Sequence, residues 1–380
     1  MLFLALINRK KLWNWRPGMR FDEILLTIIS RLDGERYKHA AFHLMKGKRS
    51  GQTLQDTEYY GLHPFFGMLP SLSNAEFDLA YGQLLGEDAI RESDGGLVSL
   101  TASGRERADR LPKSRLNGWV YRGRERIFFA RLALAVQTIS HLQAGDRSFV
   151  PVTNDPAIQQ DVRKVLLSAL RNASPAAVRD EVVSSLRDTG MDDGRLGRLA
   201  GRLSGKGLTG LTWMQLSEAS GMDVIDLKVE WVESLHIWLG GIESGKFPFL
   251  TALAEGIRPD SPLTGSARKT DELYRNGLGM EEIAARRGLK MSTIEDHFVE
   301  IAINDPLFPL GRFVPDEEAA AVAEEMKRLG TRKLSLLKEK FPDLSYFQLR
   351  LTLARMGKED GNENDQSRTA HPIAETHHRI

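Results

Sequence analysis

Hydrophobic residues recur every three or four positions along most of the chain, which is the spacing of one face of an α-helix. In the first hundred residues this pattern predicts helices over 21–32, 37–44, 53–60 and 74–85. Two short segments, AIRES and LVSLT, have strand character and are joined by Asp94, Gly95 and Gly96, which permit a tight hairpin. Three helices that precede such a hairpin are typical of a winged helix, and we expect one over residues 21–125.

The middle of the chain, residues 126–262, is expected to be helical with frequent breaks. Asp155-Pro156 and Ser174-Pro175 are typical helix starts. The segment GMDDGRLGRLAGRLSGKGLTG at 190–210 is rich in glycine and is expected to be a mobile connector. No segment here shows convincing strand alternation, so a helical connector domain is predicted.

Near the C-terminus the apolar spacing changes to that of two short helices joined by a tight turn. Apolar or small residues stand at Ile283, Ala284, Leu289, Ile294 and at Phe298 or Val299. A glycine at the turn, Gly288, can adopt positive φ without strain. Ser292, with Glu295 three residues later, is expected to form a capping box that opens the second helix. This predicts a helix-turn-helix, with the residues Ile283, Ala284, Gly288, Ser292, Thr293, Ile294, Glu295 and His297.

The outward face of the second helix complicates a simple DNA-binding interpretation. Thr293, Glu295, Asp296 and Glu300 are expected near its N-terminal and solvent-facing positions. Carboxylates are repelled by phosphate, although one can accept a hydrogen bond from cytosine. Two interpretations stay open: DNA contact, or a helical hairpin used for packing or protein contact.

Composition narrows the class of protein. A chain of 380 residues with 41% hydrophobic residues has room for two to three domains with ordinary cores. It has no cysteine, which excludes disulfides and thiolate metal ligands and fits a reducing, cytoplasmic location. No run approaches the length of a membrane span. The opening apolar run is short and is followed by its basic residues, unlike a signal peptide, so residues 1–20 are expected to be an N-terminal extension.

Charge is distributed unevenly although the net charge is only +1. Residues 1–131 carry 21 Lys and Arg against 15 Asp and Glu, whereas residues 132–380 carry 31 against 36. A basic N-terminal part favours a polyanionic partner such as DNA through counterion release.

The turn KGKRSG before the third expected helix is the first candidate DNA contact. It supplies Lys46, Lys48 and Arg49 where backbone N–H groups can also meet phosphate. Gln52 and Gln55 follow, and their amides have the geometry that pairs with adenine. The alternative is a winged helix used as a protein adaptor, with the turn a solvated loop.

A second basic run lies between residues 101 and 131, where nine basic residues stand against three acidic ones. Arg122, Arg124 and Arg126 alternate here with aromatic residues such as Trp119 and Tyr121. Arginines that hold phosphates beside rings that stack on bases are typical of single-strand binding. The alternative is a linker that leads into a long helix whose aromatic residues are buried.

Catalytic motifs are weak. AGRLSGKG at 200–207 and GGIESGKF at 240–247 resemble phosphate-binding loops, but Gly207 and Phe247 replace the hydroxyl that holds magnesium. His39 and His43 lack a third metal ligand. Asp192 and Asp193 fit a solvated turn better than a metal site. We therefore expect no enzyme activity, no metal and no cofactor, and a disordered tail over 358–380.

Three blocks of sequence carry a resemblance to a known family. EEIAARRGLKMSTIEDHF at 281–298 and RKLSLLKEKFPDLSYFQLRL at 332–351 resemble the helix-turn-helix domain at the C-termini of RecQ-family helicases. LDGERYKHAAFHLMKGKRSGQTLQDTEYYGLHPFFG at 32–67 is similar to the N-terminal part of YpbB-type proteins, and FVPVTNDPAIQQDV at 149–162 matches more faintly.

The resemblance implies a helicase-type domain over residues 263–357. It also implies a non-enzymatic accessory protein that binds DNA and works with a separately encoded RecQ-family helicase in DNA repair or recombination. The alternative is a transcriptional regulator that uses the winged helix for specific readout. The sequence leaves the oligomeric state open.

Overall fold

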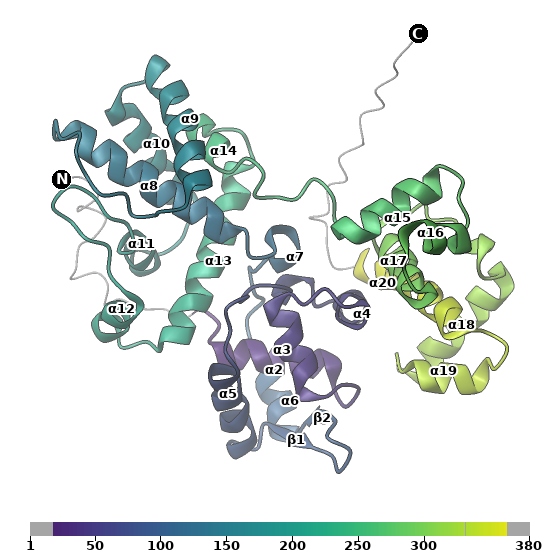
Figure 1. The fold of residues 1–380 in the computed structure, drawn as a ribbon. Coiled ribbons are helices and arrows are strands. Elements are labelled where there is room, and N and C mark those ends of the chain that lie inside the picture. Colours follow the sequence, from purple (N-terminus) through teal and green to yellow (C-terminus); the bar gives the residue numbers. More distant parts are fainter. Residues whose placement is uncertain (1–17, 331, 363–380) are drawn as a thin grey trace, which may run out of the picture. The chain divides into compact units, whose positions relative to one another are not determined.

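The computed structural model describes residues 18–330 and 332–362 (Figure 1). Within these ranges the protein is mainly helical and has one two-stranded antiparallel sheet, which confirms the expected fold class. Among the described helices, none is both long enough and apolar enough to cross a bilayer. Most of the expected N-terminal extension and residues 363–380 of the expected tail lie outside the described residues. Residues 358–362, expected to belong to a disordered tail, form the end of the last helix, so the expectation is wrong for them.

The chain forms two compact units. Of the described residues, the first unit holds 18–48 and 63–261, and the second holds 49–62 and those from 262 to 362. The expected winged-helix and connector regions thus share one unit, apart from the segment 49–62. Each unit is described by itself below.

The first unit begins with the elements expected at the N-terminal end. They are α2 (Phe21–Leu32), α3 (Lys38–Lys46), α5 (Asn74–Gly86), β1 (Ile90–Glu92), β2 (Val98–Leu100) and α6 (Ala102–Asp109). The α2 helix is the central element because Ile24, Leu25 and Ile28 are fully buried on its apolar face. It packs against α5, α6 and β2. In the hairpin, Ile90 of β1 pairs with Leu100 of β2, and both side chains are buried.

The third expected helix is present but belongs to the other unit. This helix, α4 (Gly51–Tyr59), packs against α17 (Met291–Asn304) and α20 (Tyr346–Asn362) of the second unit. The phenolic Oη of Tyr59 donates a hydrogen bond of 2.9 Å to the carbonyl oxygen of Arg350. The expectation of a three-helix winged helix within residues 21–125 is therefore wrong for this helix. Whether the hairpin acts as a DNA-binding wing stays a proposal.

The rest of the first unit is a helical assembly (Figure 1). Its helices are α7 (Gly118–Tyr121), α8 (Glu125–Gln143), α9 (Pro156–Asn172), α10 (Pro175–Asp188), α11 (Asp193–Ala200), α12 (Trp213–Ser220), α13 (Val224–Ile242) and α14 (Pro248–Leu253). Asp155 and Ser174 cap α9 and α10 with a proline next to each, as the sequence indicates. The core centres on Trp238, whose indole packs edge-on against Phe128 and donates to Ser185 Oγ.

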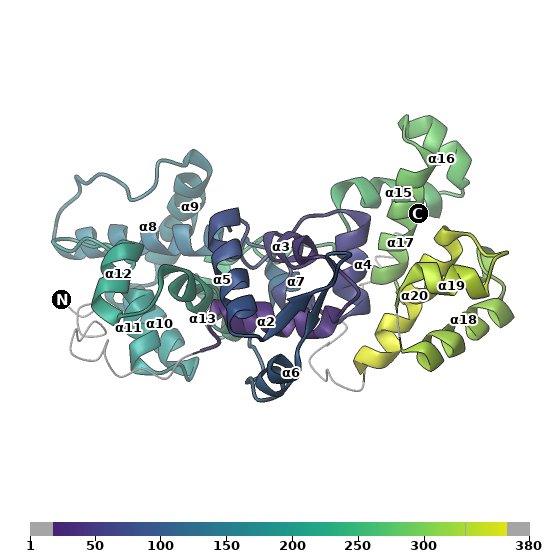
Figure 2. The ribbon, with the colours of Figure 1, turned by 90° about the horizontal axis from the view of Figure 1, so that it is seen from below.

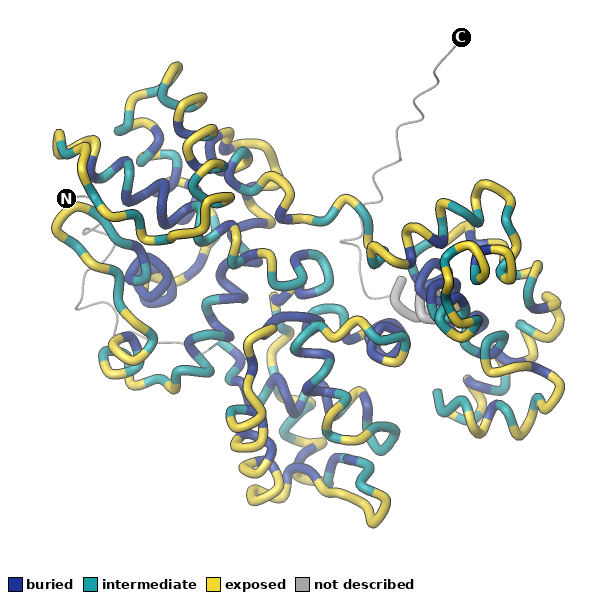
Figure 3. The backbone as a smooth tube through the Cα atoms, in the orientation of Figure 1, coloured by how far each residue is buried: buried dark blue, intermediate teal, exposed yellow. Residues whose placement is uncertain are grey.

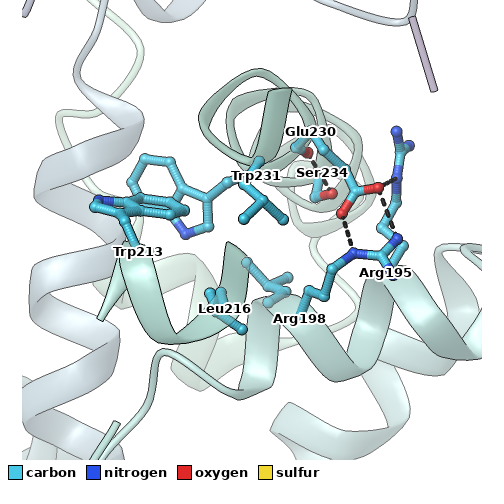
Figure 4. A pocket seen from close by; sticks show the side chains of 9 residues that line it. Arg195, Arg198, Trp213, Leu216, Glu230, Trp231 and Ser234 are labelled. Carbon is cyan, nitrogen blue, oxygen red and sulfur yellow. Dashed lines mark hydrogen bonds and ion pairs between the residues drawn. The ribbon is translucent and has the colours of Figure 1, made fainter. Parts of the chain in front are cut away.

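The glycine-rich segment expected to be a mobile connector is instead packed. Its first half forms α11, which Asp192 caps by accepting from the Arg195 N–H. Arg195 and Arg198 on this helix are buried and form ion pairs with Glu230 of α13 (Figure 4), and Arg195 also pairs with Glu233. Asp192 is thus a helix cap rather than part of a solvated turn. The reason is electrostatic: buried arginines need carboxylate partners, and α13 supplies them.

In the second unit, α17 (Met291–Asn304) is the central helix. It packs against α15 (Gly265–Arg275), α16 (Met280–Arg287), α20 (Tyr346–Asn362) and α4. Its later part, from His297 to Ile303, is buried, and Figure 3 shows α17 within the buried interior of this unit. Two further helices, α18 (Asp316–Leu329) and α19 (Leu334–Lys340), pack against α20 (Figure 2).

Candidate nucleic-acid interface

The helix-turn-helix in the second unit has the expected turn. Gly288 ends α16 with φ of 62°, the left-handed conformation that glycine adopts without strain. The carbonyl of Ala284 accepts N–H groups from this turn, including that of Leu289 at 3.0 Å. Ile283 and Ile294 are fully buried in the shared core, as the apolar spacing indicates. The two helices are therefore fixed in relation to each other through the turn and the core.

The start of the second helix differs from the expectation. The α17 helix begins at Met291 with Lys290 in the N-cap position, and no side chain caps it. Ser292 and Glu295 lie inside the helix and form no capping box. The expected role of Ser292 as N-cap is wrong because the backbone leaves the extended conformation at Lys290, two residues earlier. Ser292 is exposed on the first turn, beside Thr293, which is partly buried.

His297 faces the interior rather than a groove. Its Nδ1 lies 2.9 Å from the hydroxyl of the buried Thr270 on α15, and the guanidinium of Arg287 donates to the same hydroxyl. Burial lowers the pKa of the His297 imidazole below its ordinary value, and the charge of Arg287 lowers this pKa further. His297 therefore joins α15, α16 and α17 in the core and is not a surface residue of the helix-turn-helix.

The expected acidic face of α17 is mostly engaged inside the unit. Glu300 is buried and accepts hydrogen bonds from the backbone N–H and hydroxyl of Thr264, at the start of α15. Asp296 forms an ion pair with Arg350 of α20. Glu295 is partly buried and forms no hydrogen bond or ion pair with any described residue. The expectation that Glu300 faces solvent is wrong, and only Glu295 keeps an unpaired carboxylate.

What α17 leaves accessible is its first turn. In helix-turn-helix proteins that bind DNA, the N-terminal residues of the second helix contact base edges. Two exposed cations flank this turn in the sequence, Lys290 at the N-cap and Arg286 at the end of α16, and Lys269 is exposed on α15. None of the three side chains forms a hydrogen bond or ion pair with a described residue. Sequence reasoning missed these cations, although ARRGLK at 285–290 carries two of them beside the turn.

The basic turn before α4 is only partly available. Lys46 donates to the carbonyl oxygen of Leu72 at 2.8 Å and lies over the ring of Phe42, so it holds the first unit together. Lys48 and Arg49 are exposed, and their side chains have no partner among the described residues. These two remain proposed phosphate contacts, whereas the structure assigns Lys46 another role.

The two expected base-reading glutamines differ in their environment. Gln55 is only 3% exposed, which leaves no free amide edge for a base, so the structure does not fit its expected role. Gln52 is exposed and donates to Asp56 Oδ1, one helical turn later, at 2.8 Å. A base contact by Gln52 would have to replace this bond, and it stays a proposal.

The arginines of the second basic run hold the first unit together. Arg122 donates to the carbonyl oxygen of Trp119 and stacks on its ring at 4.4 Å, and Arg124 donates to the carbonyl oxygen of Gly256. Arg126 donates to Ser71 Oγ at 3.2 Å. The aromatic residue Tyr121 is buried. This arrangement favours the second interpretation, a linker that leads into α8, over a surface that binds single-stranded DNA.

The sites that resemble catalytic motifs are parts of the helical framework. The two loops of phosphate-binding type follow α11 and α13, without a preceding strand in either place. Their lysines, Lys206 and Lys246, pair with Asp146 and Asp188. His39 and His43 lie on α3 with ring centroids 6.3 Å apart, and no cluster of three or more metal-binding side chains occurs within the described residues.

Comparison with known proteins adds to this geometry. Residues 266–353 match the family model described as a helix-turn-helix domain. The protein YpbB of Bacillus subtilis (strain 168) is 29% identical over 350 residues, which cover 88% of this chain and 97% of YpbB. No solved structure matches the chain significantly. The chain is therefore similar to YpbB along nearly its whole length, as its first and last blocks of sequence indicate, and residues 266–353 are similar to helix-turn-helix domains.

Proposed function

We propose that this protein is a non-enzymatic DNA-binding accessory factor that works with a RecQ-family helicase in DNA repair or recombination. The observation that carries the DNA-binding part is the helix-turn-helix domain, whose α17 leaves its first turn accessible beside unpaired cations. The helicase part rests on the resemblance of residues 281–298 and 332–351 to the C-terminal domain of RecQ-family helicases.

The DNA contact in this proposal is short. Lys290 and Arg286 neutralise phosphates, while Ser292 and the free backbone N–H groups of the first turn of α17 meet the backbone or a base edge. Because α17 is buried from His297 onward, it cannot lie along a major groove over its full length. The domain as a whole is also neutral, with 15 basic and 15 acidic residues over 263–356. We therefore propose weak, largely non-specific DNA binding by this domain.

Salt dependence of DNA binding tests this surface. The full-length protein is titrated onto labelled duplex, forked and single-stranded DNA over a series of salt concentrations. Replacing both Arg286 and Lys290 with Ala should weaken duplex binding and reduce the salt slope by about two phosphate contacts. Lys327→Ala is the matched control, because Lys327 is an exposed, unpaired cation of α18 in the same unit. An unchanged slope in the folded double variant would remove this turn from the DNA interface.

Co-purification tests the helicase partnership. A tagged copy of this protein, expressed at its natural level, should retain a RecQ-family helicase after nuclease treatment, which removes complexes held together only by DNA. Failure to retain any such helicase overturns this part of the proposal and leaves the DNA-binding part standing. A sequence-specific footprint at a few promoters would instead support the transcriptional regulator.

A further inference from the structure

A groove in the first unit has no part in the proposed DNA contact. It lies between α8 and α9 and has a volume of about 540 Å³, within the range of pockets that bind ligands or peptide side chains. Leu134, Thr138 and Leu142 line it from α8 at intervals of four residues, which places them along one face of that helix. The lining is mostly apolar, and Val162 and Leu166 of α9 form buried parts of it.

The loop between α8 and α9 closes one side of the groove and is held in place. Gln137 binds this loop twice, since its Nε2 donates to the carbonyl oxygen of Val150 and its Oε1 accepts the N–H of Val152. Phe149, which lines the groove, stacks on His141 with ring centroids 4.4 Å apart. The groove is therefore largely preformed, which reduces the entropic cost of binding.

Apolar side chains at the groove are unusually exposed. Leu167 of α9 is 57% exposed and Leu142 of α8 is 37% exposed, and both line the groove. Val150, on the loop beside it, is 83% exposed. Exposed apolar side chains gathered around a concave surface are typical of protein-interaction sites.

Two arginines supply the charge that identifies the occupant. Arg163 and Arg171 line the groove, are exposed, and form no hydrogen bond or ion pair with any described residue. They lie eight residues apart on α9, with Leu167 midway between them, so about 12 Å of helix rise separates their backbones. An amphipathic peptide helix with two carboxylates seven or eight residues apart matches this spacing. A single-headed amphiphile, such as a fatty acid, would leave one arginine unmatched.

We propose that the groove between α8 and α9 binds an amphipathic helix of a partner protein, with leucine-like side chains in the groove and carboxylates at Arg163 and Arg171. This is the helix-in-groove mode of peptide recognition. The apolar groove supplies affinity, while the two arginines set the orientation and the preference for an acidic helix. The inference stands apart from the proposed DNA contact, which lies in the other unit.

A designed peptide of about 18 residues tests the groove in the full-length protein. It carries leucines at every third or fourth position and two glutamates eight residues apart, and its lysine counterpart carries lysines at those two positions. Fluorescence anisotropy should show binding of the glutamate peptide and much weaker binding of the lysine peptide. Equal binding of both peptides, or no binding of the glutamate peptide, overturns the proposal.

Variants locate the site. Leu167→Glu should abolish peptide binding. Arg163→Glu combined with Arg171→Glu should weaken binding of the glutamate peptide by about tenfold and strengthen binding of the lysine peptide. Lys164→Glu is the matched control, because Lys164 is exposed on the same helix but does not line the groove. These positions are exposed, so the variants should fold, and circular dichroism checks this. The peptide assignment is overturned if Lys164→Glu weakens binding of the glutamate peptide by as much. It is also overturned if the fatty acid laurate binds through the same two arginines while the peptide does not bind.

Discussion

Arg198 and Glu230 form a two-pronged ion pair that is almost fully buried. Arg198 Nε lies 2.6 Å from Glu230 Oε1, and Arg198 Nη2 lies 2.7 Å from Oε2, with the two residues 3% and 5% exposed. Beside them, Arg195 donates to Glu233 Oε2 at 2.7 Å. Figure 4 shows both arginines directed at Glu230, with Trp213 and Trp231 nearby. The pairs join α11 to α13, so a segment that looks flexible in sequence is fixed by charge.

Removing one member of this pair should be costly, because the other charge remains buried without a partner. We expect Glu230→Ala to lower the free energy of unfolding by about 3–5 kcal/mol. The double change Arg198→Met with Glu230→Leu should cost much less, since it removes both charges and keeps the volume. Arg110→Ala, which removes an exposed pair with Glu106, should cost under about 0.5 kcal/mol. Urea unfolding measures all three, and equal losses in the single and double variants would contradict a strong buried pair.

Limited proteolysis should distinguish the packed α11 from a true connector. Residues 258–263 have no helix or strand and contain two prolines, and the division into two compact units falls at 261/262. A protease of broad specificity should cut there before it cuts 193–200. Early cleavage within α11 would mean that the segment opens readily despite its ion pairs.

The sequence predicted the helices whose apolar residues follow a clear period, and it predicted the starts of α9 and α10 at Asp155 and Ser174, but not the start of α17. The Ile24, Leu25 and Ile28 face of α2 and the positive φ of Gly288 are examples, because both depend on local sequence. It did not predict the packing of α11, since glycines suggest mobility and the partners Glu230 and Glu233 lie some 30 residues away. Charged residues in such a segment are usually solvated, and only the fold shows that these are buried.

The place of α4 could not be predicted for a related reason. The helix GQTLQDTEY has Leu54 and Tyr59 as its main apolar residues, so its pattern does not reveal which helices it packs against. In the structure, even polar residues such as Gln55 are buried. Sequence proximity suggested a single winged helix, whereas the contacts with α17 and α20 place α4 in the second unit. The candidate DNA contacts at Gln55 and Lys46 depended on which surfaces stay free, and in the structure Gln55 is buried and Lys46 donates to the carbonyl oxygen of Leu72.

Glu76 should make stability depend on acid pH. Burial alone would raise the pKa of its carboxyl, but hydrogen bonds from Lys228 and from the backbone and hydroxyl of Ser73 lower it from 4.5 to about 2. Because the pKa is lower in the folded state, the ionised Glu76 stabilises the fold fully above about pH 4.5. This stabilisation is lost as the pH falls toward 2.

The variant Glu76→Gln should therefore unfold more easily at pH 7, by about 1–2 kcal/mol, since it weakens both a helix cap and an ion pair. The difference from the natural protein should shrink as the pH is lowered from 4.5 toward 2. Glu218→Gln is the control, because Glu218 is an exposed carboxylate of α12 without a partner among the described residues. Urea unfolding over this pH range gives the comparison, and a difference that stays constant with pH would contradict the assigned role.

The two neighbouring carboxylates Glu295 and Asp296 should respond differently to charge reversal. Asp296 pairs with Arg350, so Asp296→Lys places two cations together and should destabilise the second unit. Glu295 has no partner among the described residues and lies just after the accessible first turn of α17, where it is partly exposed. Glu295→Lys should therefore leave the fold intact.

For Glu295→Lys we expect stronger non-specific duplex binding and a salt slope steeper by about one phosphate contact, because a repulsive charge becomes an attractive one. If a helicase docks on this acidic position, the same variant should bind the helicase less tightly, since it reverses an electrostatic term of that interface. Glu324→Lys on α18 makes the same change in net charge at an exposed, unpaired position of the same unit. Anisotropy titrations with DNA and pull-downs with the helicase measure the two effects. An equal gain in DNA binding by Glu324→Lys would show that net charge alone is responsible, and helicase binding unchanged by Glu295→Lys would place the docking surface elsewhere.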